Sequence, residues 1–589
     1  MASIASHYQG PASLPSDYAL LSRYAVRHDS SGQNTFEEYN GSSDDESDDE
    51  NSTLNVPRAT SPRRYSAPPR RRPSKVTMGS AYEPAIERVM APRADPNENT
   101  PLLNPPRIVE DVERNDLASH ESSSQMFRDE LRILTKYSLP VFGTHLLEFT
   151  LVIASVLTIG HLSTKALAAI TLGSMTANVT GLSIIQGFTS ALDTVLPSAW
   201  TSPQPHLVGL WAQRMGVVIA VVLIPMLSIW LNAEPILLAL KQDPEVAHLA
   251  GLYLKWMTLG LPAYGFNLIS RRYFQSQGLF AVPTRIIFIV APINAVLNYV
   301  LVWGPEPIRL GFIGAPIASA ISFNLIALMS LIYGVFFVPK TAWYPISKRS
   351  FTSLATLVNL GLGGVGQTAS EWWAWELVGL AASMISPVAL ASQSVLLVSA
   401  STTFQAPYAL AVATSVRIGN LLGEQRARRA DIAAKTAIFI AFCVALVWSA
   451  MFFAFRNQWS YIFNNDEEVA AYVSSTLPLV ALFQVFDGNA AITAGILRAR
   501  GKQITGALLN LSGYYVIGIP FGVWLAFKHD LGLHGLWIGL TVSLVYSAVF
   551  GTWLCLRTDW NREVEKVLER IAKERKAGEE EERRAQSGR

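Results

Sequence analysis

Four acidic residues lie inside long apolar stretches of the sequence: Glu148, Glu371, Glu376 and Asp487. Charge within a membrane segment is costly, and it is usually retained for a function. Burial raises the pKa of a carboxyl group, so such a group can take a proton from an acidic compartment and release it to a neutral one. Competition between a proton and an organic cation for one carboxylate is sufficient for antiport, the exchange of the two across a membrane.

Two of these acids frame a tryptophan-rich motif, Glu371-Trp-Trp-Ala-Trp-Glu376. Five residues apart on an α-helix, they face directions about 140° apart. We therefore expect one to line a cavity and the other to face a neighbouring helix. Trp372, Trp373 and Trp375 predict an aromatic cage that holds an organic cation by cation–π attraction. The alternative is a helix end at the lipid headgroups, where tryptophans are common.

Other polar residues favour structural roles. Asp193 follows one apolar segment, and Arg417 and Asn420 follow another at the matching place. We expect these residues to form hydrogen-bonded corners. His145 precedes Glu148 by three residues without a third metal ligand, so ordinary packing is the expectation there. We predict no metal site and no cofactor.

The composition indicates that these residues lie in a membrane protein. The chain has 589 residues, half of them apolar, and a net charge of +2. Residues 127–556 carry only 41 of the 92 charged side chains, about one in ten against the usual quarter. A soluble domain of that length could not cover its surface with so little charge. A soluble enzyme and a single-span receptor are therefore excluded, and we expect no nucleic-acid partner.

Twelve apolar segments are each long enough for the roughly 20 residues that span a bilayer. They are 133–158, 166–192, 207–230, 246–269, 281–303, 312–337, 352–382, 388–414, 432–455, 468–495, 504–527 and 532–556. We expect helices, because backbone groups in lipid must be satisfied within each segment. Connections after even-numbered segments carry 15 Lys and Arg residues and those after odd-numbered segments carry six, which predicts that both termini are cytosolic.

An internal repeat divides the apolar region into two halves. The stretch from Gly311 to Ser322 resembles the stretch from Gly532 to Ser543 at an offset of 221 residues. Parallel repeats of six helices are typical of transporters whose substrate site lies between the halves. We therefore predict an all-α membrane protein with bundles at 127–337 and 352–556, joined by a cytosolic linker at 338–351.

Polar segments flank the two halves. Residues 1–126 are rich in Ser, Pro and segregated charge, and they predict a disordered cytosolic tail. Ser66 and Ser74 each follow paired arginines, as in kinase sites. Glu98, Leu102 and Leu103 resemble an acidic dileucine signal that binds a sorting adaptor and routes proteins to the vacuole. Residues 557–589 form a charged tail, in which 562–584 predict a solvated cytosolic helix.

Several motifs, in order and at family spacing, resemble the multidrug and toxic compound extrusion (MATE) transporters of eukaryotes. They are Gly160-His-Leu-Ser163, Ser190-Ala-Leu-Asp-Thr194, Gly260-Leu-Pro262, Arg272-Tyr-Phe-Gln275, Glu371-Trp-Trp-Ala-Trp-Glu376, Arg417-Ile-Gly-Asn420, Gly495-Ile-Leu-Arg498 and Tyr514-Tyr515 with Pro520. The Ser/Pro-rich tail and the dileucine are similar to fungal vacuolar members, so the vacuolar membrane is favoured over the plasma membrane.

The resemblance implies two six-helix bundles around a V-shaped cleft with alternating access. It also implies export of amphiphilic organic cations in exchange for protons, with Na⁺ the less expected coupling ion. In eukaryotic members the acids matching Glu371, Glu376 and Asp487 bind protons and substrate. Glu148 stands where many members have Gln, and Gln393 lies near a position where some have Glu. We expect a monomer.

Two other transporter classes share part of this pattern. A lipid-linked oligosaccharide flippase has the same parallel repeat, but its cleft needs Lys and Arg for pyrophosphate. A major-facilitator carrier also has twelve helices, but it needs a basic motif after the second helix, and residues 193–206 contain no Lys or Arg. Antiport of cations therefore remains the principal hypothesis.

Overall fold

The computed structural model describes residues 121–160, 162–463 and 466–587, which contain helices and no strands. The predicted sorting signal at Glu98, Leu102 and Leu103 and the sites at Ser66 and Ser74 lie outside these residues. Nine helical stretches of the described chain are long and apolar enough to cross a membrane. The other three predicted segments are also helical, but they do not meet that measure, so the number twelve stays a prediction.

The first half of the described chain runs from α2 to α11. Its helices are α2 (Ser123–Gly160), α3 (Thr164–Ala177), α4 (Ser183–Thr189), α5 (Leu192–Trp200), α6 (Leu207–Leu231), α7 (Ala233–Ala239), α8 (Pro244–Met257), α9 (Leu261–Ser276), α10 (Ala281–Trp303) and α11 (Gly314–Phe336). A π-helical turn, η3 (Asn178–Leu182), joins α3 to α4, and a short 3₁₀ turn, η4 (Gly311–Ile313), precedes α11.

The second half runs from α12 to α19. Its helices are α12 (Leu354–Ile385), α13 (Pro387–Gly423), α14 (Ala427–Ala454), α15 (Glu467–Ala499), α16 (Gln503–Leu511), α17 (Ile519–Lys528), α18 (Gly532–Leu556) and α19 (Trp560–Ser587). A π-helical stretch, η8 (Ser512–Gly518), joins α16 to α17. Short 3₁₀ turns, η5 (Lys340–Ala342) and η6 (Lys348–Phe351), lie between the halves, and η7 (Trp459–Ile462) follows α14.

Capping and proline residues explain several helix starts. The Ser163 hydroxyl accepts a hydrogen bond from the backbone N–H of Ala166, and the Asp243 carboxylate caps α8, which begins at Pro244. The predicted segment 246–269 is interrupted, because Pro262 lies in the first turn of a new helix, α9. The segment predicted at 166–192 changes to π-helical hydrogen bonding at η3, where Trp230 donates its indole N–H to Thr180.

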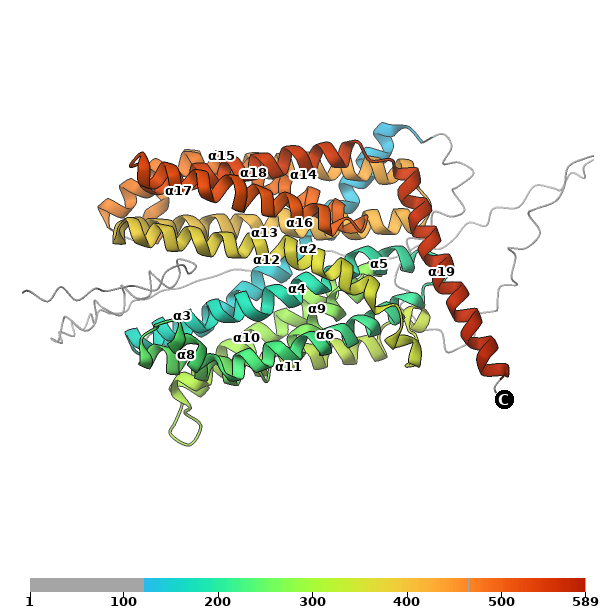
Figure 1. Ribbon diagram of the computed structural model, residues 1–589, viewed down its shortest axis with the longest axis horizontal. Coiled ribbons are helices and arrows are strands. Elements are labelled where there is room, and N and C mark those ends of the chain that lie inside the picture. Colours follow the sequence, from blue (N-terminus) through green and yellow to red (C-terminus); the bar gives the residue numbers. More distant parts are fainter. Residues whose placement is uncertain (1–120, 161, 464–465, 588–589) are drawn as a thin grey trace, which may run out of the picture. The chain divides into compact units, whose positions relative to one another are not determined.

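The largest clusters of buried apolar side chains draw on different parts of the chain. One extends from Ile159 to Leu357, and another from Ala374 to Leu544. In Figure 1 the helices α6, α9, α10 and α11 lie together, and α14, α15 and α18 lie together. Helix α2 packs against α10 of the first half and also against α13 and α14 of the second.

The last helix was expected to be solvated, and that expectation is wrong for one of its faces. Trp560, Val564 and Val567 of α19 are buried among side chains of α13, α14 and α15. Helix α19 crosses the ends of the other helices instead of extending away from them (Figure 1).

Helices α4 and α12 meet backbone to backbone. A Cβ atom added at Gly364 would lie 2.2 Å from the carbonyl oxygen of Gly187, and one added at Gly187 would lie 2.5 Å from the Cα of Val365. Only glycine permits this approach, because any side chain would force the two helices apart.

Gly364→Ala should therefore lower the free energy of unfolding by about 1–3 kcal/mol, the usual cost of overpacking. Gly216→Ala in α6 is the matched control, since a Cβ there meets no atom within 4 Å. Thermal unfolding of the purified variants in detergent measures both effects. An unfolding midpoint of Gly364→Ala equal to that of Gly216→Ala would contradict the close contact.

Candidate functional site

A cavity of about 640 Å³ lies between helices of both halves. Its walls come from α2, α3, η3, α4, α5, α8, α9, α10 and α11 of the first half and from α12, α13, α15, α16, η8 and α18 of the second. More of its lining is apolar than polar, and most of the ionisable groups in it are paired. The arrangement suits an amphiphilic ligand, with apolar surface to bury and a few charges to orient it.

Glu371 on α12 and Asp487 on α15 both line the cavity, on the wall formed by the second half. Both carboxyl groups are carried by helices of the second half and contribute to the same cavity. In the part of the chain that the structure describes, neither forms an ion pair within 4.0 Å. Arg498 acts on Glu371 only at a distance, because its guanidinium pairs with Asp193 at 3.6 Å. This wall is therefore the acidic side of the cavity.

The remaining residues of the predicted aromatic site are dispersed. Trp372 lines the cavity, whereas Trp375 packs edge-on against Phe483 and Trp537 in the core of the second half. Glu376 does not line the cavity. Gln393 is buried away from it and accepts a hydrogen bond of 2.8 Å from the Trp537 indole N–H. The predicted cage of three tryptophans is therefore not formed.

Aromatic residues that the sequence analysis did not single out supply the aromatic surface instead. Phe404 and Tyr408 of α13 and Tyr264 of α9 line the cavity, together with Tyr514, which the sequence analysis named only as part of a family motif. The Tyr408 hydroxyl accepts a hydrogen bond of 2.9 Å from Gln186 of α4, which joins the two halves. Scattered aromatic residues carry no spacing signal in a sequence, so only the fold reveals this set.

Glu148 of α2 faces the cavity from the opposite wall as part of a charged group. Its carboxylate pairs with both terminal nitrogens of Arg271 on α9, and one of its oxygens lies 3.1 Å from Nδ1 of His145. His145 also stacks edge-on against Tyr408, with ring centroids 4.9 Å apart. His145 therefore packs inside the protein as expected, and it also contacts the carboxylate of Glu148. Arg271 was assigned to a connection, but it lies inside α9 and lines the cavity.

A second charged group, the gate cluster, consists of Asp193, Thr194, Arg272, Arg498 and Gln503. Asp193 lies 3.0 Å from Nε of Arg272 and 3.6 Å from Nε of Arg498, so one carboxylate joins α5, α9 and α15. Thr194 donates to the backbone oxygen of Arg498 and accepts a hydrogen bond of 2.7 Å from Gln503. The structure thus places Asp193 in a hydrogen-bonded corner that connects the two halves.

The third group contains a residue that the sequence analysis missed. Glu130 of α2 is fully buried, and its carboxylate oxygens accept hydrogen bonds of 2.6 to 2.8 Å from Arg417 on α13 and Arg429 on α14. Burial alone would raise the pKa of Glu130, but the two guanidiniums hold it below its usual value. The backbone oxygen of Asn420 accepts a hydrogen bond of 2.8 Å from Thr201 of the first half. Arg417 and Asn420 therefore contribute to contacts between the halves.

Within the described residues, no group of three or more His, Cys, Asp and Glu side chains could hold a metal ion. Cys443 is exposed on α14 and Cys555 is buried in α18.

Comparison with known proteins gives consistent matches. The MatE family profile matches residues 140–300 and 365–524. An uncharacterized transporter of Schizosaccharomyces pombe is 36% identical over 454 residues, which cover 77% of this chain and 85% of that protein. Multidrug and toxin extrusion protein 1 of Homo sapiens is 30% identical over 438 residues, covering 74% and 76% of the two chains. The crystal structure of the eukaryotic MATE transporter AtDTX14 matches with a TM-score of 0.71 and 30% identity, covering 76% of this chain and all of that one.

A double-mutant cycle can measure the interaction energy between Glu148 and Arg271. Glu148→Gln and Arg271→Gln should each destabilise the protein, because each leaves a charge inside the bundle without its partner. The double variant should be more stable than the sum of the single effects predicts, by about 1 kcal/mol or more. Thermal unfolding of the four proteins measures this coupling energy, and purely additive effects would show that the pair does not interact.

Proposed function

Because the chain belongs to the MatE family of transporters, we propose that this multi-pass membrane protein is an antiporter that moves organic cations out of the cytosol in exchange for protons. The observation that carries the proposal is the position of Glu371 and Asp487 on one wall of the cavity without a cationic partner among the described residues. A xenobiotic cation can supply the missing positive charge, and so can a proton.

The exchange follows from competition for these two carboxyl groups. Two carboxylates in one cavity of low polarity repel each other, so either one protonation or one bound cation stabilises the pair. Protonation of one carboxylate lowers the affinity of the site for the organic cation. The cation is therefore released on the side of the membrane where the proton concentration is high. Trp372 and the aromatic residues of α13 offer π-faces and apolar surface to the rest of the substrate.

Exchange requires that the cavity opens to only one side at a time. Two features support alternating access by two bundles of six helices around a V-shaped cleft. The two largest apolar clusters lie mainly in different halves, and the first extends into the second half only through residues of α12. The gate cluster joins the halves through polar contacts. Water can replace such contacts when the halves separate, whereas it cannot replace a packed apolar interface.

The orientation and the membrane follow from the positive-inside rule and from the tail. We place the gate cluster at the cytosolic end, because it adjoins the arginine-rich connections and the C-terminal helix. The dileucine signal favours the vacuolar membrane, where the lumen is acidic and inward storage of cations can use the proton gradient. In this proposal Glu371 and Asp487 bind the proton and the cation. The other predicted site residues, Glu148, Glu376 and Gln393, have a less direct part in binding.

A flippase for pyrophosphate-linked lipids is less well supported. Three arginines do line the cavity, namely Arg271, Arg272 and Arg498. Each of them pairs with Glu148 or Asp193, so none offers a free guanidinium to pyrophosphate.

Transport by sealed vesicles tests the proposal. With an imposed pH gradient, the wild-type protein should take up a fluorescent organic cation, and a protonophore should abolish the uptake. Glu371→Gln and Asp487→Asn should each reduce this uptake by about tenfold or more, because each removes one ionisable group from the pair. Glu306→Gln, a change of the same type in an exposed loop, is the control and should leave the rate unchanged.

Three results would contradict the proposal in different ways. Full uptake by Glu371→Gln would remove this carboxylate from the mechanism. Uptake driven by a Na⁺ gradient alone would show that Na⁺, and not the proton, is the coupling ion. Uptake of no cation under either gradient would favour anionic or lipid substrates.

A further inference from the structure

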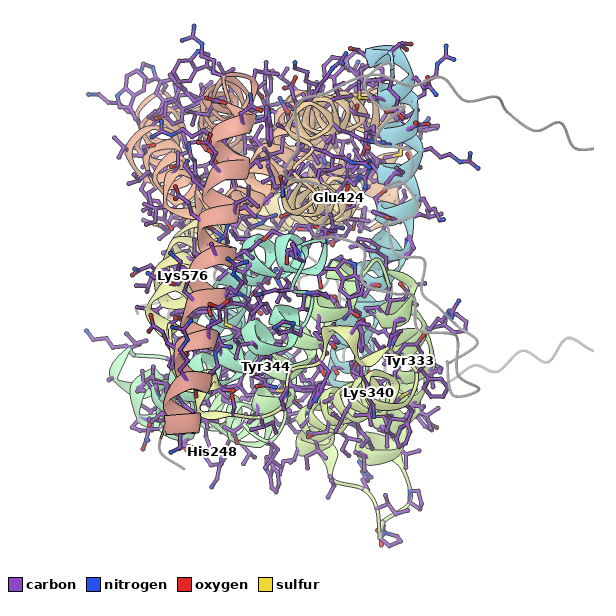
Figure 2. The ribbon with its side chains drawn as sticks, turned by 90° about the vertical axis from the view of Figure 1, so that its right-hand side faces the viewer. His248, Tyr333, Lys340, Tyr344, Glu424 and Lys576 are labelled. Atoms are coloured by element: carbon purple, nitrogen blue, oxygen red, sulfur yellow. The ribbon has the colours of Figure 1, made fainter. Side chains whose placement is uncertain are left out.

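Helix α19 extends across the end of the molecule at which the gate cluster lies. Figure 2 looks onto this end and shows α19 passing in front of helices from both halves, with Lys576 on its second part. Neither the transport cavity nor its lining residues include any part of α19. The contacts of the helix fall into two anchors and a middle section.

The first anchor fixes the start of α19 to the second half. Trp560, Val564 and Val567 are buried in an apolar cluster with α13 and α14, and the Trp560 indole donates a hydrogen bond of 3.1 Å to Asp431. Glu563 is 4% exposed and pairs with Arg500 at 3.1 Å. Burial alone would raise the pKa of Glu563, but Arg500 and Lys566 hold it below its usual value, so the pair is ionised at neutral pH.

The second anchor fixes the later part of α19 to the first half. Glu574 is 5% exposed and pairs at 3.0 Å with Arg214 of α6, itself only 1% exposed. Arg349 in η6 donates a hydrogen bond of 2.9 Å to the backbone oxygen of Glu574 and lies 3.6 Å from Glu581. This anchor consists of charged and polar contacts, whereas the first also has an apolar core.

The middle section lies over the gate cluster. Arg570 donates a hydrogen bond of 3.5 Å to the backbone oxygen of Thr194, the residue that also bonds to Arg498 and Gln503. Burial lowers the pKa of Arg570 to about 10, which leaves the guanidinium charged at neutral pH. One helix thus contacts the second half, the gate cluster and the first half in succession.

We propose that α19 is a strap that holds this end of the cavity closed, with Glu563 and Glu574 as positioning residues for the gate. The inference rests on alternating access as proposed above, but not on the coupling ion or the substrate. Parting the two halves at the gate requires α19 to leave one of its anchors. The second anchor is the one to release, because its contacts among the described residues are charged or polar, without an apolar core to keep it in place. Weakening that anchor should shift the protein toward the state in which the gate is open.

The distance between the halves reports this shift directly. Spin labels at Pro203→Cys, after α5, and at Arg428→Cys, near the start of α14, lie in exposed positions of the two halves. The labels are introduced into the full chain with Cys443→Ser and Cys555→Ala, and the distance distribution is measured by pulsed electron paramagnetic resonance without substrate. Glu574→Gln should at least double the population at longer distances. Glu580→Gln, the same change at an exposed position of α19, is the matched control and should leave the distribution unchanged.

A milder variant keeps the test decisive if Glu574→Gln does not fold. Glu581→Gln removes a partner of Arg349 that is 47% exposed, and it should produce a smaller shift in the same direction. If the distance distributions of both anchor variants coincide with that of Glu580→Gln, the proposal that α19 is a strap is wrong. The distance measurement uses no gradient and no substrate, so its result does not depend on proton-coupled transport. Conversely, a negative result for α19 would not contradict transport by Glu371 and Asp487.

Discussion

The high cost of a charge in lipid is the constraint on which this structure depends. The buried carboxylates Glu130 and Asp193 each accept contacts from two arginines, and Glu148 pairs with Arg271. These groups lie at the cavity or between the two halves, where polar side chains can meet. Against this background Glu371 and Asp487 stand out, because both line the cavity and neither forms an ion pair among the described residues. The fold thus separates carboxylates that are paired with arginines from the two that we propose to serve transport.

Much of the helical framework could be predicted from the length of apolar runs. The segments predicted at 281–303 and 532–556 have the bounds of α10 and α18. The breaks within segments could not be predicted in this way, since they depend on tertiary contacts such as the bond from Trp230 to Thr180 beside η3. The count of twelve helices and the two bundles remain predictions, although the internal repeat agrees with them.

The residues of the candidate site likewise include some that could be predicted from the sequence and some that could not. Glu371 and Asp487 were found because an acid in an apolar run is conspicuous, whatever the surrounding fold. Arg271 was missed because its segment was ended at 269, two residues too early for it to face the cavity. The tryptophan cage failed for a geometric reason: neighbouring residues on a helix point about 100° apart, so consecutive tryptophans cannot line one wall. Such errors arise where a side chain's direction, not its type, decides the role.

The glycine contact between α4 and α12 has a consequence for how well the protein insulates the membrane. With the Gly187 carbonyl this close to the position of a Gly364 side chain, no water molecule fits between the two backbones at that point. A file of water molecules conducts protons, and a leak of that kind would discharge the gradient on which an exchanger runs. The glycine contact therefore excludes water between α4 and α12 at this point, and it closes one route by which such a leak could form.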